Sequence, residues 1–203
     1  SDKEKTKTII RIIDAMGNAI PNTYEYNLSK YMAGGGDNKL WPYLKKAAEL
    51  GTGRTEHYDY MINWGETTQD ITIRDEYSKK KYEAGQVSAG MMYYNYNVMM
   101  GAEPNAILIA VGDNDTYPVW VLQSMGIRRD IHLINMSLIL IDDYRAKLFK
   151  ELGIEPWDMH WDAPAAAEEE RRRFEKNFIK NITENKKHFP VYITLTAAGY
   201  KEG

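Results

Sequence analysis

The chain has 203 residues, of which 43% are hydrophobic and 27% are charged, and its formal net charge is −3. This length allows one sizeable core with an appended region, and the near-neutral charge does not favour nucleic acid or an acidic membrane surface as a partner. The absence of cysteine excludes disulfides, thiol nucleophiles and thiolate metal sites. No apolar run approaches the ~20 residues that a membrane-spanning helix requires.

Residues 1–75 predict a helical and irregular N-terminal region. Apolar residues recur at helical spacing in three segments, each followed by glycine: 8–16, 24–32 and about 40–50. From 52 to 75 this pattern stops, and residues 70–74 alternate between polar and apolar as a short strand does. We therefore expect a docking loop or a small hairpin over 52–75, with the domain boundary at its end.

Residues 76–203 predict an α/β domain. A long helical stretch over 76–100 precedes the continuous apolar run 106–111, which is typical of a strand buried on both faces. Pro118 stands where a first-turn proline would, so the next helix is expected over 119–125. The remaining expected elements are a strand over 131–135, a helix capped by Asp142 or Asp143, a helix that begins at Asp162 and Pro164, and a third strand over 190–196.

This order predicts an α/β fold: a small, partly parallel sheet of about three main strands flanked by helices, beside a helical N-terminal region. In such sheets, ligands bind beyond the carboxyl ends of the strands, where loops meet helix N-termini. Two loops occupy that position: Gly112-Asp113-Asn114-Asp115-Thr116 after the first strand, and Asn135-Met136-Ser137, which leads towards Asp142 and Asp143, after the second. If the two strands are parallel neighbours, these polar side chains converge at one edge of the sheet.

The first of these loops allows two interpretations. Asp113 and Asp115, with Asn114 between them, offer the hard oxygen ligands that suit Mg²⁺, Mn²⁺ or Ca²⁺. Alternatively, Asp115 or Thr116 caps the following helix. Asp113 or Asn114 then stabilises a tight turn through backbone hydrogen bonds. Both interpretations can hold for different residues of the loop.

Aromatic residues offer a second, more general signal. Fifteen Tyr and five Trp against four Phe indicate half-buried amphipathic rings, which suit carbohydrate or protein contact. The segment 157–162 combines two Trp with a His and two Asp. It is either a sugar-binding platform with an acid nearby, or a loop that inserts its Trp side chains into the core.

The stretch 105–123 has an ordered set of features: an apolar strand, Gly-Asp-Asn-Asp-Thr, Tyr117, Pro118 and a Trp-containing helix that ends in Gln123. It resembles the hallmark segment of bacterial multi-spanning membrane proteins of unknown function, whose membrane half resembles protein O-mannosyltransferases and whose other half is soluble. The resemblance covers about residues 82–196. It continues through Arg128 or Arg129 with Asp130, then Asn135, Ser137, Leu138, Asp143, Tyr144 and Pro190-Val191-Tyr192.

The resemblance implies a soluble half that lies outside the cytoplasm, periplasmic or lipid-anchored, with membrane association through a leader or anchor before Ser1. Its motifs mark the expected ligand-binding residues: Gly112, Asp113, Asn114, Asp115, Thr116, Asn135, Ser137, Asp143 and Tyr144. Residues 1–203 contain no segment that resembles the membrane half, and Asp143 precedes Tyr144 where the family usually has Trp.

Three functions follow from these observations. The first is a binding or accessory module linked to glycan handling, with a carbohydrate or a small phosphorylated molecule as its ligand. The alternative is a metal-dependent glycosyl or phosphoryl transferase or hydrolase that uses Asp113 and Asp115 with a divalent cation. The third is a structural interaction domain in which the motif constrains folding.

Overall fold

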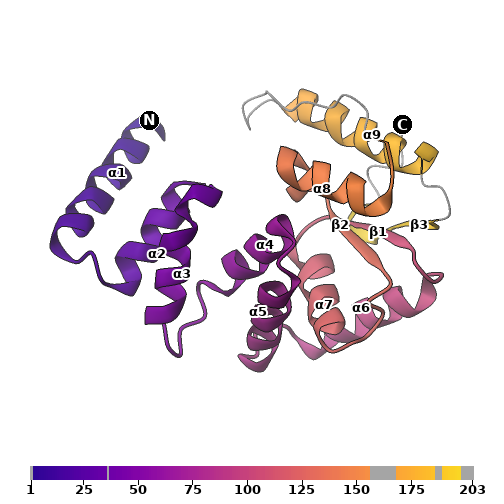
Figure 1. The fold of residues 1–203 in the computed structure, drawn as a ribbon, viewed down its shortest axis with the longest axis horizontal. Coiled ribbons are helices and arrows are strands. Elements are labelled where there is room, and N and C mark those ends of the chain that lie inside the picture. The colour runs from indigo at the N-terminus through magenta and orange to yellow at the C-terminus, as the bar shows by residue number, and fades with distance from the viewer. Residues whose placement is uncertain (1, 36, 156–167, 186–188, 198–203) are drawn as a thin grey trace. The chain divides into compact units, whose positions relative to one another are not determined.

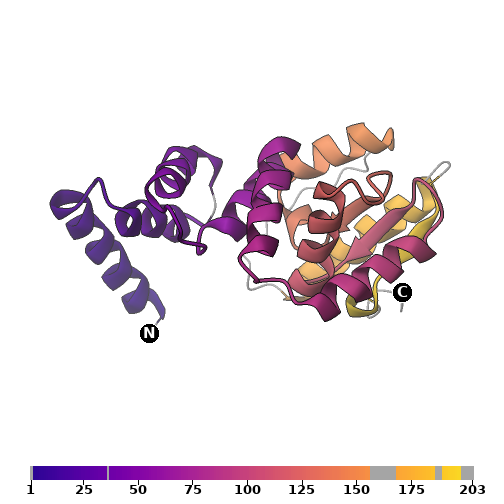
Figure 2. The same ribbon diagram turned by 90° about the horizontal axis from the view of Figure 1, so that it is seen from below.

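A computed structural model of the chain describes residues 2–35, 37–155, 168–185 and 189–197. The chain forms two compact units, residues 1–66 with 70–84 and residues 67–69 with 85–203. The first unit is built from helices, and the second contains a three-stranded sheet flanked by helices (Figures 1 and 2). The predicted α/β fold with about three strands and a helical N-terminal region is confirmed. Within the described ranges, no helix combines the length and the apolar character needed to cross a membrane.

The three helices predicted in the N-terminal region are confirmed. The described part of residues 1–84 contains α1 (Asp2–Ala19), α2 (Tyr24–Ala33), the 3₁₀ turn η1 (Asn38–Leu40), α3 (Trp41–Leu50), α4 (Tyr58–Thr68) and α5 (Ile71–Glu83). Thr23 is the N-cap of α2, because its hydroxyl accepts a hydrogen bond from the backbone nitrogen of Tyr26 at 3.3 Å.

The expectation of a loop or small hairpin over 52–75 is wrong, because α4 and the start of α5 occupy this stretch. Gly65 lies inside α4, and a Cβ atom on it would approach the backbone nitrogen of Arg74 to 2.6 Å. This glycine therefore permits close packing of the two helices instead of breaking one. Asp70 is the N-cap of α5 and accepts a hydrogen bond from Ile73 N at 3.2 Å. The alternating residues 70–74 thus form the N-cap and the first turn of α5.

The single long helix predicted over 76–100 is in fact two helices, α5 and α6 (Ala89–Gly101). Gly85 has a left-handed φ of 71° in the segment between them. Ser88 is the N-cap of α6, since its hydroxyl accepts a hydrogen bond from Met91 N at 3.3 Å. Both residues are sequence signals of a helix boundary, so this break could be predicted from the sequence.

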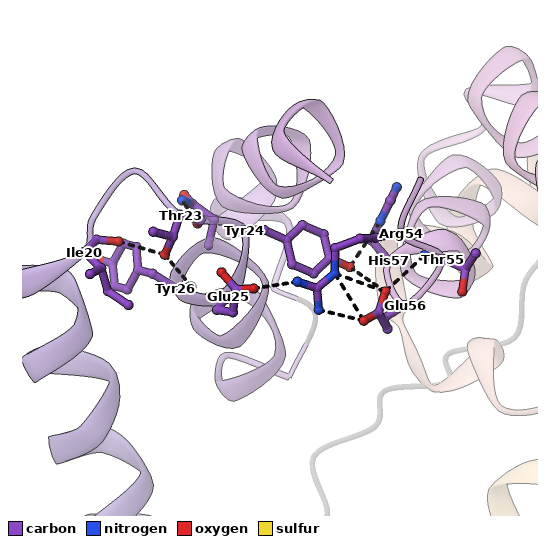
Figure 3. Close-up of polar contacts among 10 residues, drawn as sticks. Ile20, Thr23, Tyr24, Glu25, Tyr26, Arg54, Thr55, Glu56 and His57 are labelled. Atoms are coloured by element: carbon purple, nitrogen blue, oxygen red, sulfur yellow. Dashed lines mark hydrogen bonds and ion pairs between the residues drawn. The ribbon is translucent and has the colours of Figure 1, made fainter. Parts of the chain in front are cut away.

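Arg54 connects α2 to the segment that precedes α4 (Figure 3). Its guanidinium group pairs with Glu25 at 2.5 Å and with Glu56 at 2.7 Å, and it lies 4.0 Å from the ring centroid of Tyr24. The phenol oxygen of Tyr24 lies 3.3 Å from Nδ1 of His57. Hydrogen bonding to Arg54 lowers the pKa of Glu56 to about 2, and burial raises the pKa of Tyr24 to about 12.

The sheet of the second unit has the strand order β2–β1–β3, and both pairings are parallel. The strands are β1 (Ile107–Ala110), β2 (His132–Asn135) and β3 (Val191–Ile193). Ile107 is aligned with His132 on one side and with Val191 on the other. Every residue of β1 is buried, as expected for a central strand covered on both faces. The three predicted strands are confirmed, although each is shorter than expected.

Helices cover both faces of this sheet (Figure 1). They are α6, α7 (Asp113–Ser124), α8 (Asp142–Leu152) and α9 (Glu168–Asn185), with the 3₁₀ turn η2 (Leu138–Leu140) before α8. α8 and α9 pack with Ile107 and Ile109, and α6 and α7 lie on the other face. The predicted apolar face of α9 is buried at Phe174, Phe178 and Ile182. The start predicted for this helix at Asp162, and the segment 157–162, lie outside the described residues.

The helix after β1 begins at Asp113, so the prediction that it begins near Pro118 is wrong. Gly112 is the N-cap residue and has a φ of 84°, which glycine adopts without strain. Pro118 lies inside the helix and has no N–H to donate to the carbonyl of Asn114, four residues earlier. Nδ2 of Asn95, on α6, donates to that carbonyl at 2.9 Å instead. A side chain from another helix thus allows the proline at this position.

Candidate functional site

The carboxyl ends of the three strands meet at one edge of the sheet, because both pairings are parallel. The chain passes from β1 to its neighbour β2 through α7, and then returns to the other side of β1 as β3. The strand order therefore reverses between β1 and β3, which is where open α/β sheets bind ligands. The parallel neighbours expected from the sequence thus place Gly112–Thr116, Asn135 and Ser137 at this edge.

Thr116 joins the ends of β1 and β2. Its hydroxyl donates to the carbonyl oxygen of Gly112 at 2.7 Å and accepts a hydrogen bond from Nδ2 of Asn135 at 2.9 Å. Oδ1 of Asn135 accepts a hydrogen bond from the backbone nitrogen of Ser137 at 2.7 Å. Thr116 and Asn135 are buried, and their polar groups are used within the protein. Both residues therefore hold the ends of β1 and β2 together at this edge of the sheet.

Asp115 is buried and joins the first turn of α7 to the segment after β3. Its carboxylate accepts a hydrogen bond from the hydroxyl of Thr196. That hydroxyl also lies 2.7 Å from the carbonyl oxygen of Val111 and 3.1 Å from the hydroxyl of Thr194. Thr194 and Thr196 were missed by sequence reasoning, which assigned both to the third strand. Their position offered a signal for a site role, because they follow a strand whose carboxyl end lies at the same edge of the sheet.

The remaining motif side chains, those of Asp113 and Asn114, are exposed. Neither makes a side-chain hydrogen bond or ion pair within the described part of the chain. The N-cap residue of α7 is Gly112, and no side chain caps the helix, so the predicted capping by Asp115 or Thr116 is wrong. A Cβ atom on Gly112 would meet no atom within 4 Å, so the space at this N-cap residue is open.

Helix α6 adds two residues that the sequence did not single out. Asn95 is fully buried, and its Nδ2 donates to the carbonyls of Met91 and Asn114, both at 2.9 Å. Its Oδ1 is buried without a hydrogen-bond partner among the described residues. Burial, and then the carboxylate of Asp115, raise the pKa of Tyr94, so this phenol lies within electrostatic reach of the motif. Nothing local in the sequence marks either residue, because they act through contacts with α7.

Asp143 and Tyr144 occupy different surroundings at the start of α8. Tyr144 is buried in the hydrophobic cluster beneath this helix, whereas Asp143 is exposed. The N-cap residue is Ile141, so the expectation that Asp142 or Asp143 caps the helix is wrong. Both carboxylates lie in the first turn, where the helix dipole favours negative charge. The structure therefore gives Tyr144 a packing role, and only Asp143 of this pair faces solvent.

Residues 91–197, just over half of the chain, match the family described as TMEM260-associated domain 2. The chain belongs to this family. TMEM260 is a family of multi-pass membrane proteins that resemble glycosyltransferases. Neither a curated protein nor a solved structure matches the chain. The region matched to TMEM260-associated domain 2 contains β1, β2, β3 and every residue described above at their carboxyl edge.

Other residues of this TMEM260-associated domain stabilise the opposite edge of the sheet. Arg128 pairs with Asp130 at 2.9 Å, which lowers the pKa of Asp130. The Arg128 guanidinium also donates to backbone carbonyls at the end of α6 and just beyond it, those of Met99, Ala102 and Glu103. Nε2 of Gln123, on α7, donates to the carbonyl of Ile131 at 2.8 Å. These motif residues hold helices to strands, away from the candidate site.

In the TMEM260-associated domain, the carboxylates of Asp113 and Asp115 do not face a common position. Side chains two residues apart on a helix do not face each other, and here one carboxylate is exposed while the other is buried against Thr196. Among the described residues, no three His, Asp or Glu side chains form a group that could hold a metal ion. Asp113 and Asn114 are the exposed oxygen donors that a cation at this edge would use.

Proposed function

We propose that the chain is a non-catalytic binding module that accompanies glycan handling, with its ligand at the carboxyl edge beside Asp113 and Asn114. The observation that carries this proposal is that two motif side chains are buried and two are exposed. Asp115 and Thr116 are buried and connect the edge to the segment after β3 and to the last residue of β2, whereas Asp113 and Asn114 are exposed to solvent. The buried pair thus forms a rigid support for the exposed pair, which suits binding.

The chemistry of the exposed pair favours a hydroxyl-bearing ligand. A carboxylate accepts hydrogen bonds, and an amide both donates and accepts them, so the two side chains match the hydroxyl groups of a sugar. A helix N-terminus alone would attract a phosphate. Here Asp113 and Asp115 already place two carboxylates in the first turn of α7, which opposes a second anion. We therefore favour a carbohydrate over a small phosphorylated ligand.

An extracytoplasmic location, periplasmic or lipid-anchored, is part of this proposal. Its support is the family relationship to multi-pass membrane proteins that resemble glycosyltransferases. Fractionation of cells that express the full-length protein, with protease added to intact cells or spheroplasts, tests the location. Degradation in intact spheroplasts supports it, and full protection would refute it.

Calorimetric titration with mannose, glucose and N-acetylglucosamine tests the binding role. We expect at least one sugar to bind the native chain, and Asp113→Asn and Asn114→Ala to weaken that binding by roughly tenfold, as for the loss of one charge-assisted hydrogen bond. Asp14→Asn, which changes an exposed aspartate on α1, serves as the matched control and should bind normally. Sugar binding whose affinity neither substitution at the motif changes would exclude this site.

The same variants test the alternative, a metal-dependent glycosyl or phosphoryl transferase or hydrolase. That function requires Asp113 and Asp115 to act on one cation, which their different surroundings do not favour. Titration with Mg²⁺, Mn²⁺ and Ca²⁺ separates the two functions. Cation binding that is lost in both Asp113→Asn and Asp115→Asn would favour the enzyme, and its absence from the native chain would exclude that mechanism.

A further inference from the structure

An apolar groove lies between α1 and α2, within the first compact unit. Its volume is about 360 Å³, and its described lining is apolar except for the hydroxyl of Ser29. We call it the α1–α2 groove, and the residues that line it are Ile9, Ile12, Ile13, Met16, Ser29, Met32 and Ala33.

The walls of this groove are open to solvent on both helices. On α1, Ile9 is 51% exposed and Ile12 is 55% exposed, and on the facing α2, Met32 is 49% exposed. Ile13 is buried between them. Removing the large apolar side chains of both walls from water would be favourable in proportion to the apolar area covered, so this concave surface suits a partner.

The chemistry of the α1–α2 groove favours a helix as its occupant. A sugar or an extended peptide would leave its hydroxyl or backbone groups unpaired against this apolar lining, at a cost in free energy. A helix satisfies its own backbone groups and presents only side chains to a groove. A lipid surface is less suited, because the four basic residues in the sequence of α1 are offset by three acidic ones.

α1 itself has the side chains that such a groove accepts. Its residues at 9, 12, 13 and 16 are isoleucine or methionine at positions i, i+3, i+4 and i+7, the pattern of a helix that binds in a groove. Because α1 is also one wall of the groove, α1 of a second copy would cover the exposed side chains of both chains in one two-fold symmetric contact. The apolar face of α9, in contrast, is already buried in the hydrophobic cluster of its own unit.

The charges along α1 favour an antiparallel pairing. Lys5 is four residues before Ile9 and therefore lies on the same side of the helix as the groove residues. The last turn of α1 contains no basic residue, and the helix dipole favours positive charge there. In an antiparallel pair centred between Ile12 and Ile13, Lys5 lies beside Ile20 of the other copy, at this end of its helix. A parallel pair would instead place the two Lys5 side chains together.

We propose that the α1–α2 groove is a self-association surface, in which α1 of a second copy binds antiparallel to α1. The contact would combine α1 and α2 of each chain into a four-helix arrangement with the groove residues at its centre. A dimer formed in this way carries two candidate sites, one on each chain. The proposal does not involve the carboxyl edge of the sheet, so self-association and sugar binding can each fail without the other.

Sedimentation equilibrium of the full chain from about 1 μM to about 200 μM tests this proposal, because small interfaces give affinities in this range. We expect a monomer–dimer equilibrium. Ile12→Lys and Met32→Lys would each bury an unpaired charge in the contact and should weaken dimerisation roughly tenfold or more. Ile10→Lys is the matched control, since Ile10 is 50% exposed on α1 but does not line the groove, and it should dimerise normally. Thermal melting followed by circular dichroism checks that all three variants fold.

Disulfide cross-linking tests the orientation of the two helices, and the natural chain contains no cysteine that would interfere. In a mixture of the Lys5→Cys and Ile20→Cys variants, mild oxidation should join one chain of each kind, because a disulfide forms only between closely placed residues. The Lys5→Cys variant alone should form little covalent dimer. Efficient cross-linking of Lys5→Cys to itself would indicate a parallel pair and overturn the antiparallel arrangement.

Three further results would overturn the proposal. The first is a native chain that remains monomeric over the whole concentration range. The second is a dimer that Ile12→Lys weakens no more than Ile10→Lys does, because the contact would then lie elsewhere. The third is a monomer that floats with phosphatidylglycerol vesicles through a contact that Ile12→Lys removes and Ile10→Lys keeps, which would identify the groove as a lipid-binding surface.

Discussion

The variant Thr116→Val tests how the strand ends are held together at the candidate edge. In Thr116→Val, the buried Nδ2 of Asn135 loses the hydroxyl to which it donates. We expect the free energy of unfolding, measured by urea denaturation, to fall by about 1–3 kcal/mol, the usual cost of an unpaired buried polar group. Ser137→Ala is the control, since the contact with Asn135 comes from its backbone nitrogen, and it should change stability by less than about 0.5 kcal/mol. A fully stable Thr116→Val variant would contradict this role.

At the same scale, local sequence identified the motif but not the division of roles within it. The position of Gly112–Thr116 after a buried strand could be predicted, because hydrophobic pattern and turn residues are local signals. The burial of Asp115 could not, because its partner Thr196 comes from a segment far along the chain. Tyr94 and Asn95 escaped notice for the same reason, since only the packing of α6 on α7 gives them a role.

The packing of α6 on α7 explains how a proline is accommodated inside a helix, and a double-mutant cycle tests it. Asn95→Ala removes the donor to the carbonyl of Asn114, and should cost about 1–3 kcal/mol of unfolding free energy. In the Pro118→Ala background the new N–H of residue 118 can bond that carbonyl, so Asn95→Ala should cost less. We expect a coupling energy of about 0.5–2 kcal/mol by denaturant unfolding.

This cycle has a clear negative outcome. Additive effects of Asn95→Ala and Pro118→Ala would show that the Asn95 side chain does not compensate for the proline. Met91→Ala provides a control on α6, because its side chain does not contact the Asn114 carbonyl through a hydrogen bond, and its cost should be the same with or without Pro118.

At the level of elements, errors of prediction arose where tertiary contacts changed the meaning of a residue. Gly65 and Pro118 are helix breakers by propensity, yet each lies inside a helix because a neighbouring helix either needs the space or supplies the missing bond. The strands were predicted more successfully. A run of four buried residues such as β1 is recognisable from its continuous apolar character.

At the scale of the whole molecule, we expect the two compact units to differ in their sensitivity to pH. His57 lies in the first unit, enclosed by the rings of Tyr24, Tyr58 and Tyr77. Burial, and then the charge of Lys80, lower its pKa in the folded chain. In the unfolded chain the pKa of histidine is about 6.5. The folded state therefore binds fewer protons in acid, and the stability that neutral His57 provides above about pH 6.5 is lost as the pH falls.

We accordingly expect acidification from about pH 7.5 to about pH 5.5 to weaken the first unit selectively. Hydrogen exchange read by mass spectrometry, corrected for intrinsic rates, should show reduced protection in peptides from α2, α4 and α5, and little change in β1 and α7. His57→Gln removes the titrating group, so this variant should show similar protection at both pH values. An equal loss of protection in both units, or a pH dependence that survives in His57→Gln, would contradict the assignment of the effect to His57.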